Sequence, residues 1–120
     1  MKIELVNIKH LQEYEQIFSR QKMEYLWREY LSCSKASWNK LDSMNEEQMR
    51  LAFHSWKSSS QIFGMEDFVR QCAAIEEKLS KRQSRSAMKN LISLCRQCYL
   101  DSTAKVAAYF KEKQGDGYGQ

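Results

Sequence analysis

The sequence has no proline and only four glycines among its 120 residues. Three of these glycines, Gly115, Gly117 and Gly119, fall in the last six residues, so Gly64 stands alone in the body of the chain. Turns, hairpins and bulges depend heavily on these two residue types. Their scarcity argues against a multi-stranded β fold, a disordered linker and a glycine-rich nucleotide-binding loop, and it favours long helices.

Long apolar runs are also missing. No stretch approaches the ~20 apolar residues that span a bilayer, and the mixed residues after Lys2 do not form a signal-peptide core. We therefore expect a cytoplasmic protein without a membrane partner, and the start at Met1 favours a free-standing chain. The cysteines fit this expectation as buried thiols in a reducing compartment; they are Cys33, Cys72, Cys95 and Cys98.

The charge balance is mildly positive, with 19 Lys and Arg against 15 Asp and Glu, a net charge of +4. At 14.2 kDa we expect one domain and a monomer. The densest basic cluster (Lys78, Lys81, Arg82 and Arg85) surrounds an expected turn and is typical of a solvated loop. We expect no nucleic-acid partner. A small nucleic-acid-binding bundle stays open as an alternative, and steeply salt-dependent binding to DNA or RNA would reveal it.

Apolar residues at steps of three and four predict a short first helix and four longer ones. Asn7 and Asn45 are candidate N-terminal caps, and Gly64 fits the left-handed position after a helix end. This pattern predicts an all-α fold, an antiparallel four-helix bundle with a short additional N-terminal helix. We expect a helical domain over 1–113 and a flexible Gly-rich tail over 114–120. The expected helices are 8–18, 21–41, 46–63, 66–80 and 87–111.

The core sides of the helices follow from the same spacing. The third helix should bury Met49, Phe53, Trp56, Ser60 and Phe63, and the fourth should bury Phe68, Cys72, Ile75 and Leu79. The three tryptophans are expected in the core. Cys95 and Cys98 have a C-x-x-C spacing, but they fall inside a long helix without a second such pair, so we expect no metal site.

His54 does not belong to the core pattern. It follows Phe53, so its side chain points about 100° away from the buried seam, in the middle of a helix. Taken alone, such a residue is ordinarily a solvent-exposed histidine beside a lysine. The other histidine, His10, lies in the expected first helix among polar neighbours and suggests no function. The residues that share the face of His54 at helical spacing are Glu47, Arg50, Leu51, Lys57, Ser58 and Gln61.

The run from His54 to Gly64 resembles the signature of the histidine-containing phosphotransfer (HPt) domain family. That signature has a histidine, a lysine at +3, small residues at +4 to +6, an apolar residue at +9 and a glycine at +10. The +4 position is often glycine in the family and is serine here. Glu76, at +22, matches a position where the family has a polar or acidic side chain. The matching residues are His54, Lys57, Ser58, Ser59, Ser60, Phe63 and Gly64.

The resemblance implies a role for each residue of this face. His54 would accept a phosphoryl group on Nε2 from the phospho-aspartate of one receiver domain and pass it to another. Glu76 would accept a hydrogen bond from Nδ1–H, and Lys57 would offset the negative charge of the transferring group. Ser58 would keep the surface low. Gln61 would donate to a phosphoryl oxygen or contact the partner, and Arg50 and Leu51 would contribute to docking.

The resemblance also implies that the chain needs neither a kinase activity nor a cofactor. An HPt protein has no kinase activity of its own and no cofactor, and any Mg²⁺ belongs to the acidic pocket of the receiver domain. The implied partners are response-regulator receiver domains and a hybrid sensor kinase. The main alternative is a non-catalytic helical adaptor that docks receiver domains without being phosphorylated.

Overall fold

The computed structural model describes residues 3–118, with side chains described for residues 3–112, and this part of the chain is helical without any strand. The all-α prediction is therefore confirmed for these residues. Short 3-10 turns follow α2 and α3 and precede α5. The helices are α1 (Ile8–Phe18), α2 (Arg20–Lys40), α3 (Glu46–Ser60), α4 (Glu66–Ser80) and α5 (Lys89–Tyr118), and the turns are η1 (Leu41–Ser43), η2 (Gln61–Phe63) and η3 (Ser86–Met88).

The helix boundaries differ from expectation mainly at the end of the chain. α1 and α4 have the expected bounds, and the third expected helix is divided into α3 and η2. α5 continues to Tyr118 without a break at residue 113, so it covers 114–118 of the expected tail. Glycine disfavours a helix by only about 1 kcal/mol, which does not forbid one. Residues 119 and 120 lie outside the described part, and the flexibility of the tail stays a prediction.

Side-chain caps start the helices where the sequence indicates. The Asn7 side chain accepts from the His10 N–H at the start of α1. Asn45 and Gln48 form a reciprocal capping box at the start of α3, with distances of 2.8 and 2.9 Å. Such a box satisfies two backbone donors that a helix start otherwise leaves unpaired. The capping box therefore fixes where α3 begins.

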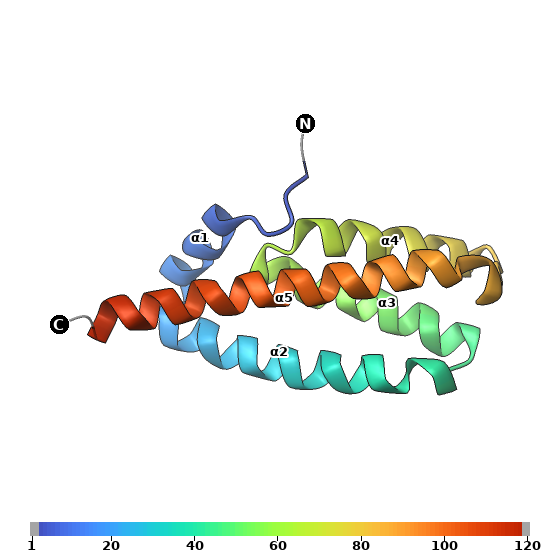
Figure 1. Cartoon of the computed structure of the whole chain (residues 1–120), viewed down its shortest axis with the longest axis horizontal. Coiled ribbons are helices and arrows are strands. Elements are labelled where there is room, and N and C mark those ends of the chain that lie inside the picture. Colours follow the sequence, from blue (N-terminus) through green and yellow to red (C-terminus); the bar gives the residue numbers. More distant parts are fainter. Residues whose placement is uncertain (1–2, 119–120) are drawn as a thin grey trace.

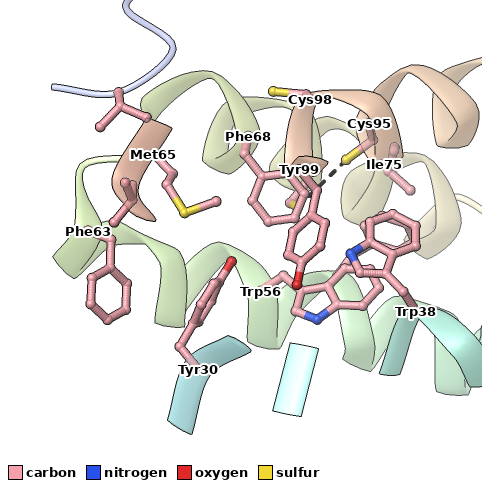
Figure 2. Close-up of a cluster of buried hydrophobic side chains, with 14 of the residues drawn as sticks. Tyr30, Trp38, Trp56, Phe63, Met65, Phe68, Ile75, Cys95, Cys98 and Tyr99 are labelled. Atoms are coloured by element: carbon pink, nitrogen blue, oxygen red, sulfur yellow. Dashed lines mark hydrogen bonds between the residues drawn. The ribbon is translucent and has the colours of Figure 1, made fainter. Parts of the chain in front are cut away.

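Four helices contribute to one aromatic core. Successive helices from α2 to α5 run in opposite directions along the long axis (Figure 1). Trp38 of α2 stacks on Trp56 of α3 with 4.2 Å between ring centroids, and Phe68 of α4 lies 5.5 Å from Tyr99 of α5 (Figure 2). The three tryptophans and the expected core residues of the third and fourth helices are all buried. Phe18 and Leu91 also lie at apolar positions of the helical pattern, but both side chains are 40% exposed.

Two buried hydroxyl pairs cross this core, and the apolar pattern did not indicate either. Tyr30 and Ser60 are joined by a 2.6 Å hydrogen bond between α2 and α3. Ser34 and Tyr99 form a second one, also 2.6 Å, between α2 and α5. Because each hydroxyl finds a partner, these polar groups are buried without the penalty of an unmade hydrogen bond.

Gly64 sits at the sharp reversal between α3 and α4. Its φ of +69° is the left-handed conformation expected there, and its N–H donates to the Gln61 carbonyl. A second reason for glycine comes from the N-terminal segment, which the sequence did not predict. The Asn7 N–H donates to the Gly64 carbonyl at 2.8 Å, and a Cβ on Gly64 would lie 2.6 Å from the Asn7 carbonyl oxygen. Backbone torsion and close approach therefore both require glycine.

Arg85 differs from the solvated loop residue that the basic cluster predicted. It is half-buried, and its guanidinium donates to the carbonyls of Leu41, Asp42 and Met44 in the α2–α3 connection. The side chain therefore ties the residue before η3 to the connection that precedes α3. Lys81, by contrast, is exposed and forms a surface ion pair with Glu77 at 3.0 Å.

The helices of residues 3–118 include none whose length and apolar content would allow it to cross a membrane.

Candidate functional site

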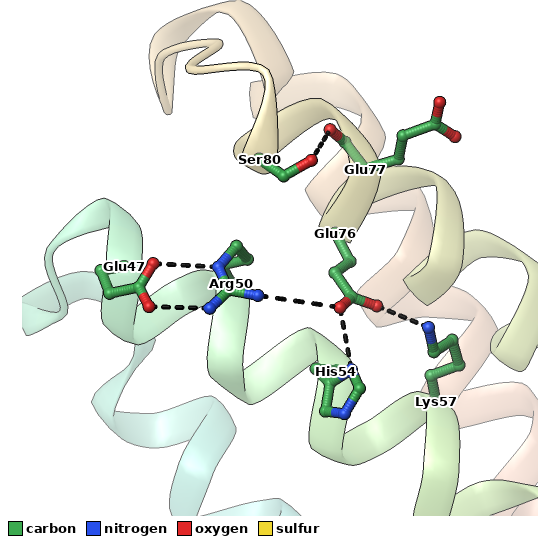
Figure 3. Close-up of polar contacts among 7 residues, drawn as sticks. All are labelled: Glu47, Arg50, His54, Lys57, Glu76, Glu77 and Ser80. Atoms are coloured by element: carbon green, nitrogen blue, oxygen red, sulfur yellow. Dashed lines mark hydrogen bonds and ion pairs between the residues drawn. The ribbon is translucent and has the colours of Figure 1, made fainter.

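His54 lies in the middle of α3, about 100° around the helix from the Phe53 side chain of the core seam. Its side chain is 54% exposed, whereas the neighbouring Phe53 is fully buried. The buried seam of α3 fixes the rotation of the helix, so the position after Phe53 must face outward. α4 packs beside α3 and supplies Glu76, whose carboxylate reaches the imidazole (Figure 3). The prediction that His54 is exposed is confirmed.

Glu76 holds one nitrogen of the imidazole. Its Oε2 atom lies 2.8 Å from His54 Nδ1, the contact that the family resemblance implied. An ionised carboxylate only accepts hydrogen bonds, so in the neutral form of the ring the proton lies on Nδ1 and the lone pair on Nε2. Figure 3 shows Nε2 pointing away from Glu76, and no described side chain hydrogen-bonds to it. The arrangement presents Nε2 as an outward-facing nucleophile.

The second oxygen of Glu76 is occupied by a cation. Lys57 Nζ lies 2.7 Å from Oε1, and the carboxylate is only 16% exposed. The Lys57 ammonium holds the pKa of Glu76 below its usual range, with a further contribution from the His54 hydrogen bond, while desolvation opposes both. Glu76 is thus ionised at neutral pH, which favours its acceptor role toward Nδ1. The sequence placed Lys57 near the histidine but did not predict this ion pair.

Arg50 approaches the same carboxylate from the preceding turn of α3. Its Nε and Nη2 atoms donate to Glu47 at 2.9 and 2.7 Å, and its Nη1 atom lies 3.9 Å from Glu76 Oε2. Glu47 raises the pKa of Arg50, and the Arg50 hydrogen bond lowers the pKa of Glu47. The structure therefore brings His54, Lys57 and Arg50 together around the carboxylate of Glu76.

The remaining predicted site residues lie farther from this group. Leu51 is 51% exposed, and Ser58 is exposed on the same face. Gln61 begins η2, and none of its described contacts is with His54. Instead it lines a hollow of about 290 Å³ together with His10, Tyr14, Gly64, Met65, Glu66 and Val69. A role of Gln61 toward a phosphoryl group on His54 stays a prediction.

The cysteines lie apart from this site. Cys95 and Cys98 are buried in α5, and Cys72 Sγ is 3.9 Å from Cys95 Sγ. Burial raises the pKa of Cys72 far above its usual value and that of Cys98 to about 11. Such thiols are protonated and poor ligands. Cys33 is exposed, contrary to expectation. In the described residues no group of three or more His, Cys, Asp or Glu is placed to hold a metal ion.

Comparisons with protein-family models, with curated proteins and with solved structures find no match for this chain. The chemistry of the site and the spacing of its residues therefore have to carry the functional inference. What the group can do is specific: an exposed imidazole, fixed through Nδ1, can offer Nε2 to an electrophile, and two cations near it can offset negative charge.

Proposed function

We propose that this chain is a histidine phosphotransfer protein of a multistep two-component phosphorelay. His54 takes a phosphoryl group from the aspartate of one receiver domain and passes it to the aspartate of another. The observation that carries the proposal is the exposed His54 whose Nδ1 is held 2.8 Å from an ionised Glu76. The signature spacing from His54 to Gly64 supports it independently.

The transfer step follows from the tautomer that Glu76 selects. The lone pair of Nε2 attacks the phosphorus of the aspartyl phosphate, a P–N bond forms, and the P–O bond to the aspartate breaks. The aspartate leaves as a carboxylate, and the Nδ1 proton stays in place. The phosphorylated ring then carries positive charge, which the Glu76 carboxylate offsets. The reverse sequence delivers the group to the second receiver domain.

Lys57 acts on the phosphoryl group in this proposal. Its ammonium sits one turn after His54, paired with Glu76 Oε1. A lysine head on a flexible stem moves between neighbouring acceptors at small cost. When the phosphoryl group arrives, the ammonium is close enough in the helix to stabilise its oxygens, while Glu76 keeps its contact with Nδ1.

The surroundings suit a partner that brings the phosphoryl group in its own pocket. We propose that α2 to α5 form an antiparallel four-helix bundle, with α1 as the additional short helix, which presents α3 as a rigid face. Leu51 gives that face an apolar contact and Ser58 keeps it low. The net charge of +4 favours an acidic receiver pocket, which would hold its own Mg²⁺. In this proposal the chain works as a cytoplasmic monomer downstream of a hybrid sensor kinase, has no kinase activity of its own and binds no nucleic acid.

The test is phosphate transfer from labelled receiver domains. Incubated with each phosphorylated receiver domain of the source organism, the wild-type chain should acquire acid-labile, alkali-stable phosphate. His54→Gln should abolish the label, and His10→Gln, the matched control, should retain it. Labelling of His54→Gln at the wild-type level would show that the site is elsewhere. Receiver binding without any labelling of the wild type would instead favour the adaptor.

A further inference from the structure

Arg50 lies one helical turn before His54 and reaches toward the same anchoring atom. Its Nη1 atom is 3.9 Å from Glu76 Oε2, the oxygen that accepts the hydrogen bond from His54 Nδ1 at 2.8 Å. Figure 3 shows the guanidinium between Glu47 on one side and Glu76 on the other. The guanidinium is thus part of the group that surrounds the imidazole.

The two sides of this guanidinium are held very differently. Toward Glu47, both Nε and Nη2 donate at ordinary hydrogen-bond lengths of 2.9 and 2.7 Å. Toward Glu76, the 3.9 Å separation is too long for a hydrogen bond, so Nη1 has only a loose electrostatic contact. A stronger acceptor placed nearby can therefore capture Nη1 without breaking the Glu47 pair.

The helix directs His54 toward Arg50. Side chains on an α-helix lean toward the N-terminus, so the imidazole leans over the turn that carries Arg50. Lys57 stands on the opposite side, one turn later, and its 2.7 Å ion pair with Glu76 is already tight. Of the two cations near the ring, Arg50 has the weaker contact with Glu76, so it loses less interaction energy than Lys57 when it turns to a new acceptor.

We propose that Arg50 is a second phosphoryl-binding residue, whose Nη1 turns from Glu76 to the oxygens of a phosphoryl group on His54 Nε2. Glu47 holds the other side of the guanidinium and so positions it. A phosphoryl dianion is a stronger acceptor than a carboxylate, and a guanidinium fork suits it. This inference rests on the proposed function, and it gives Arg50 a chemical role in place of the docking role that the sequence predicted.

The experiment phosphorylates the chain chemically, so that no receiver domain is needed. Phosphoramidate transfers its phosphoryl group to accessible neutral imidazoles and releases ammonia. ³¹P NMR then follows the second ionisation of the phosphohistidine as a function of pH. A cation beside the group favours the dianion, so Arg50→Gln should raise the pKa of the phosphoryl group by about half a unit, roughly a threefold change in its dissociation constant. Added salt should diminish the difference.

The matched control is Arg70→Gln. Arg70 forms the same kind of pair at the same spacing, with Asp67, on the exposed side of α4. It should leave the phosphoryl pKa at the wild-type value. Identical values for the Arg50 and Arg70 variants would overturn the inference, and so would failure of phosphoramidate to label His54 in the wild type.

The role of Glu47 is tested by a double-mutant cycle. Glu47→Gln releases one side of the guanidinium, so Arg50 should bind the phosphoryl group less well and the phosphoryl pKa should rise in the wild-type background. In the Arg50→Gln background most of this effect should vanish, because Glu47 acts through Arg50. An equal effect in both backgrounds would contradict that role. A chain that shows the Arg50 effect but accepts nothing from any receiver domain would retain this inference and lose the proposed function.

Discussion

The two faces of α3 differ in burial and in chemistry, although residues of both faces follow one another along the chain. Phe53 is fully buried, and its ring centroid lies 5.9 Å from that of Trp38 and 4.9 Å from that of Trp56. His54, the next residue, is 54% exposed to solvent and makes its one described side-chain contact with Glu76. The buried face stabilises the fold through buried area and packing, whereas the exposed face holds the imidazole through polar contacts with Glu76. In α3, one residue step, a rotation of about 100°, therefore separates a buried core side chain from an exposed imidazole.

The largest effect should come from the buried face. Phe53→Ala removes a ring that is packed on two tryptophans, and we expect it to lower the free energy of unfolding by about 3–5 kcal/mol. His54→Gln should lower it by less than about 1 kcal/mol, because the side chain is exposed. Urea denaturation followed by circular dichroism measures both. Similar losses for the two variants would contradict the separation of the two faces.

Gly64 should come next, because it sets the reversal that places α4 and Glu76 beside α3. Gly64→Ala puts a Cβ at positive φ and against the Asn7 carbonyl, and we expect a loss of about 2–3 kcal/mol in thermal or chemical unfolding. Gly64→Asn separates the two causes, since asparagine tolerates the left-handed conformation but still carries a Cβ. If Gly64→Asn is as stable as the wild type, the close approach to Asn7 has no energetic weight.

The hydroxyl pair across the core gives a smaller effect on the buried face. Tyr30→Phe leaves the Ser60 hydroxyl buried without its 2.6 Å partner, which should cost about 1–3 kcal/mol in the free energy of unfolding. Tyr25→Phe is the matched control. Because Tyr25 is 48% exposed, removal of its hydroxyl should leave the free energy of unfolding nearly unchanged. If Tyr30→Phe leaves the free energy of unfolding unchanged, water or a new partner must satisfy the Ser60 hydroxyl.

The smallest effect should come from the polar face. Lys57→Met removes the main cause of the lowered pKa of Glu76, so this pKa should rise toward its usual value of about 4.3. Lys81→Met, which removes the partner of Glu77, is the control and should leave Glu76 unchanged. Carboxyl ¹³C NMR titration measures both. An unaltered Glu76 titration in Lys57→Met would show that another group sets the pKa.

The same pair predicts the sign of a pH effect on stability. Because the pKa of Glu76 is lower in the folded chain, the unfolded chain takes up the proton first as the pH falls. The stabilisation is complete above about pH 4.3 and is lost as the pH falls through the folded pKa. We expect less than about 1 kcal/mol for this partly exposed pair. Lys57→Met should flatten the acid side of the stability profile; a steeper acid side would contradict the assignment.

Residues close in the chain could be predicted well, and contacts between distant residues could not. Helical spacing placed Phe53 in the core and His54 outside it, and the capping pattern placed Asn45 correctly. The His54–Glu76 contact was anticipated only through the family resemblance. Spacing says nothing of which distant groups meet, so the Lys57–Glu76 pair and the approach of Asn7 to Gly64 were missed.

The most direct measurement is the position of phosphate on the chain after incubation with a phosphorylated receiver domain. With ¹⁵N-labelled histidine, NMR correlation between ³¹P and ¹⁵N identifies the bonded nitrogen in the intact protein. The account predicts a single P–N bond, at Nε2 of His54, with Nδ1 still protonated and facing Glu76. Phosphate at His10, at Nδ1 of His54 or at no histidine would contradict it.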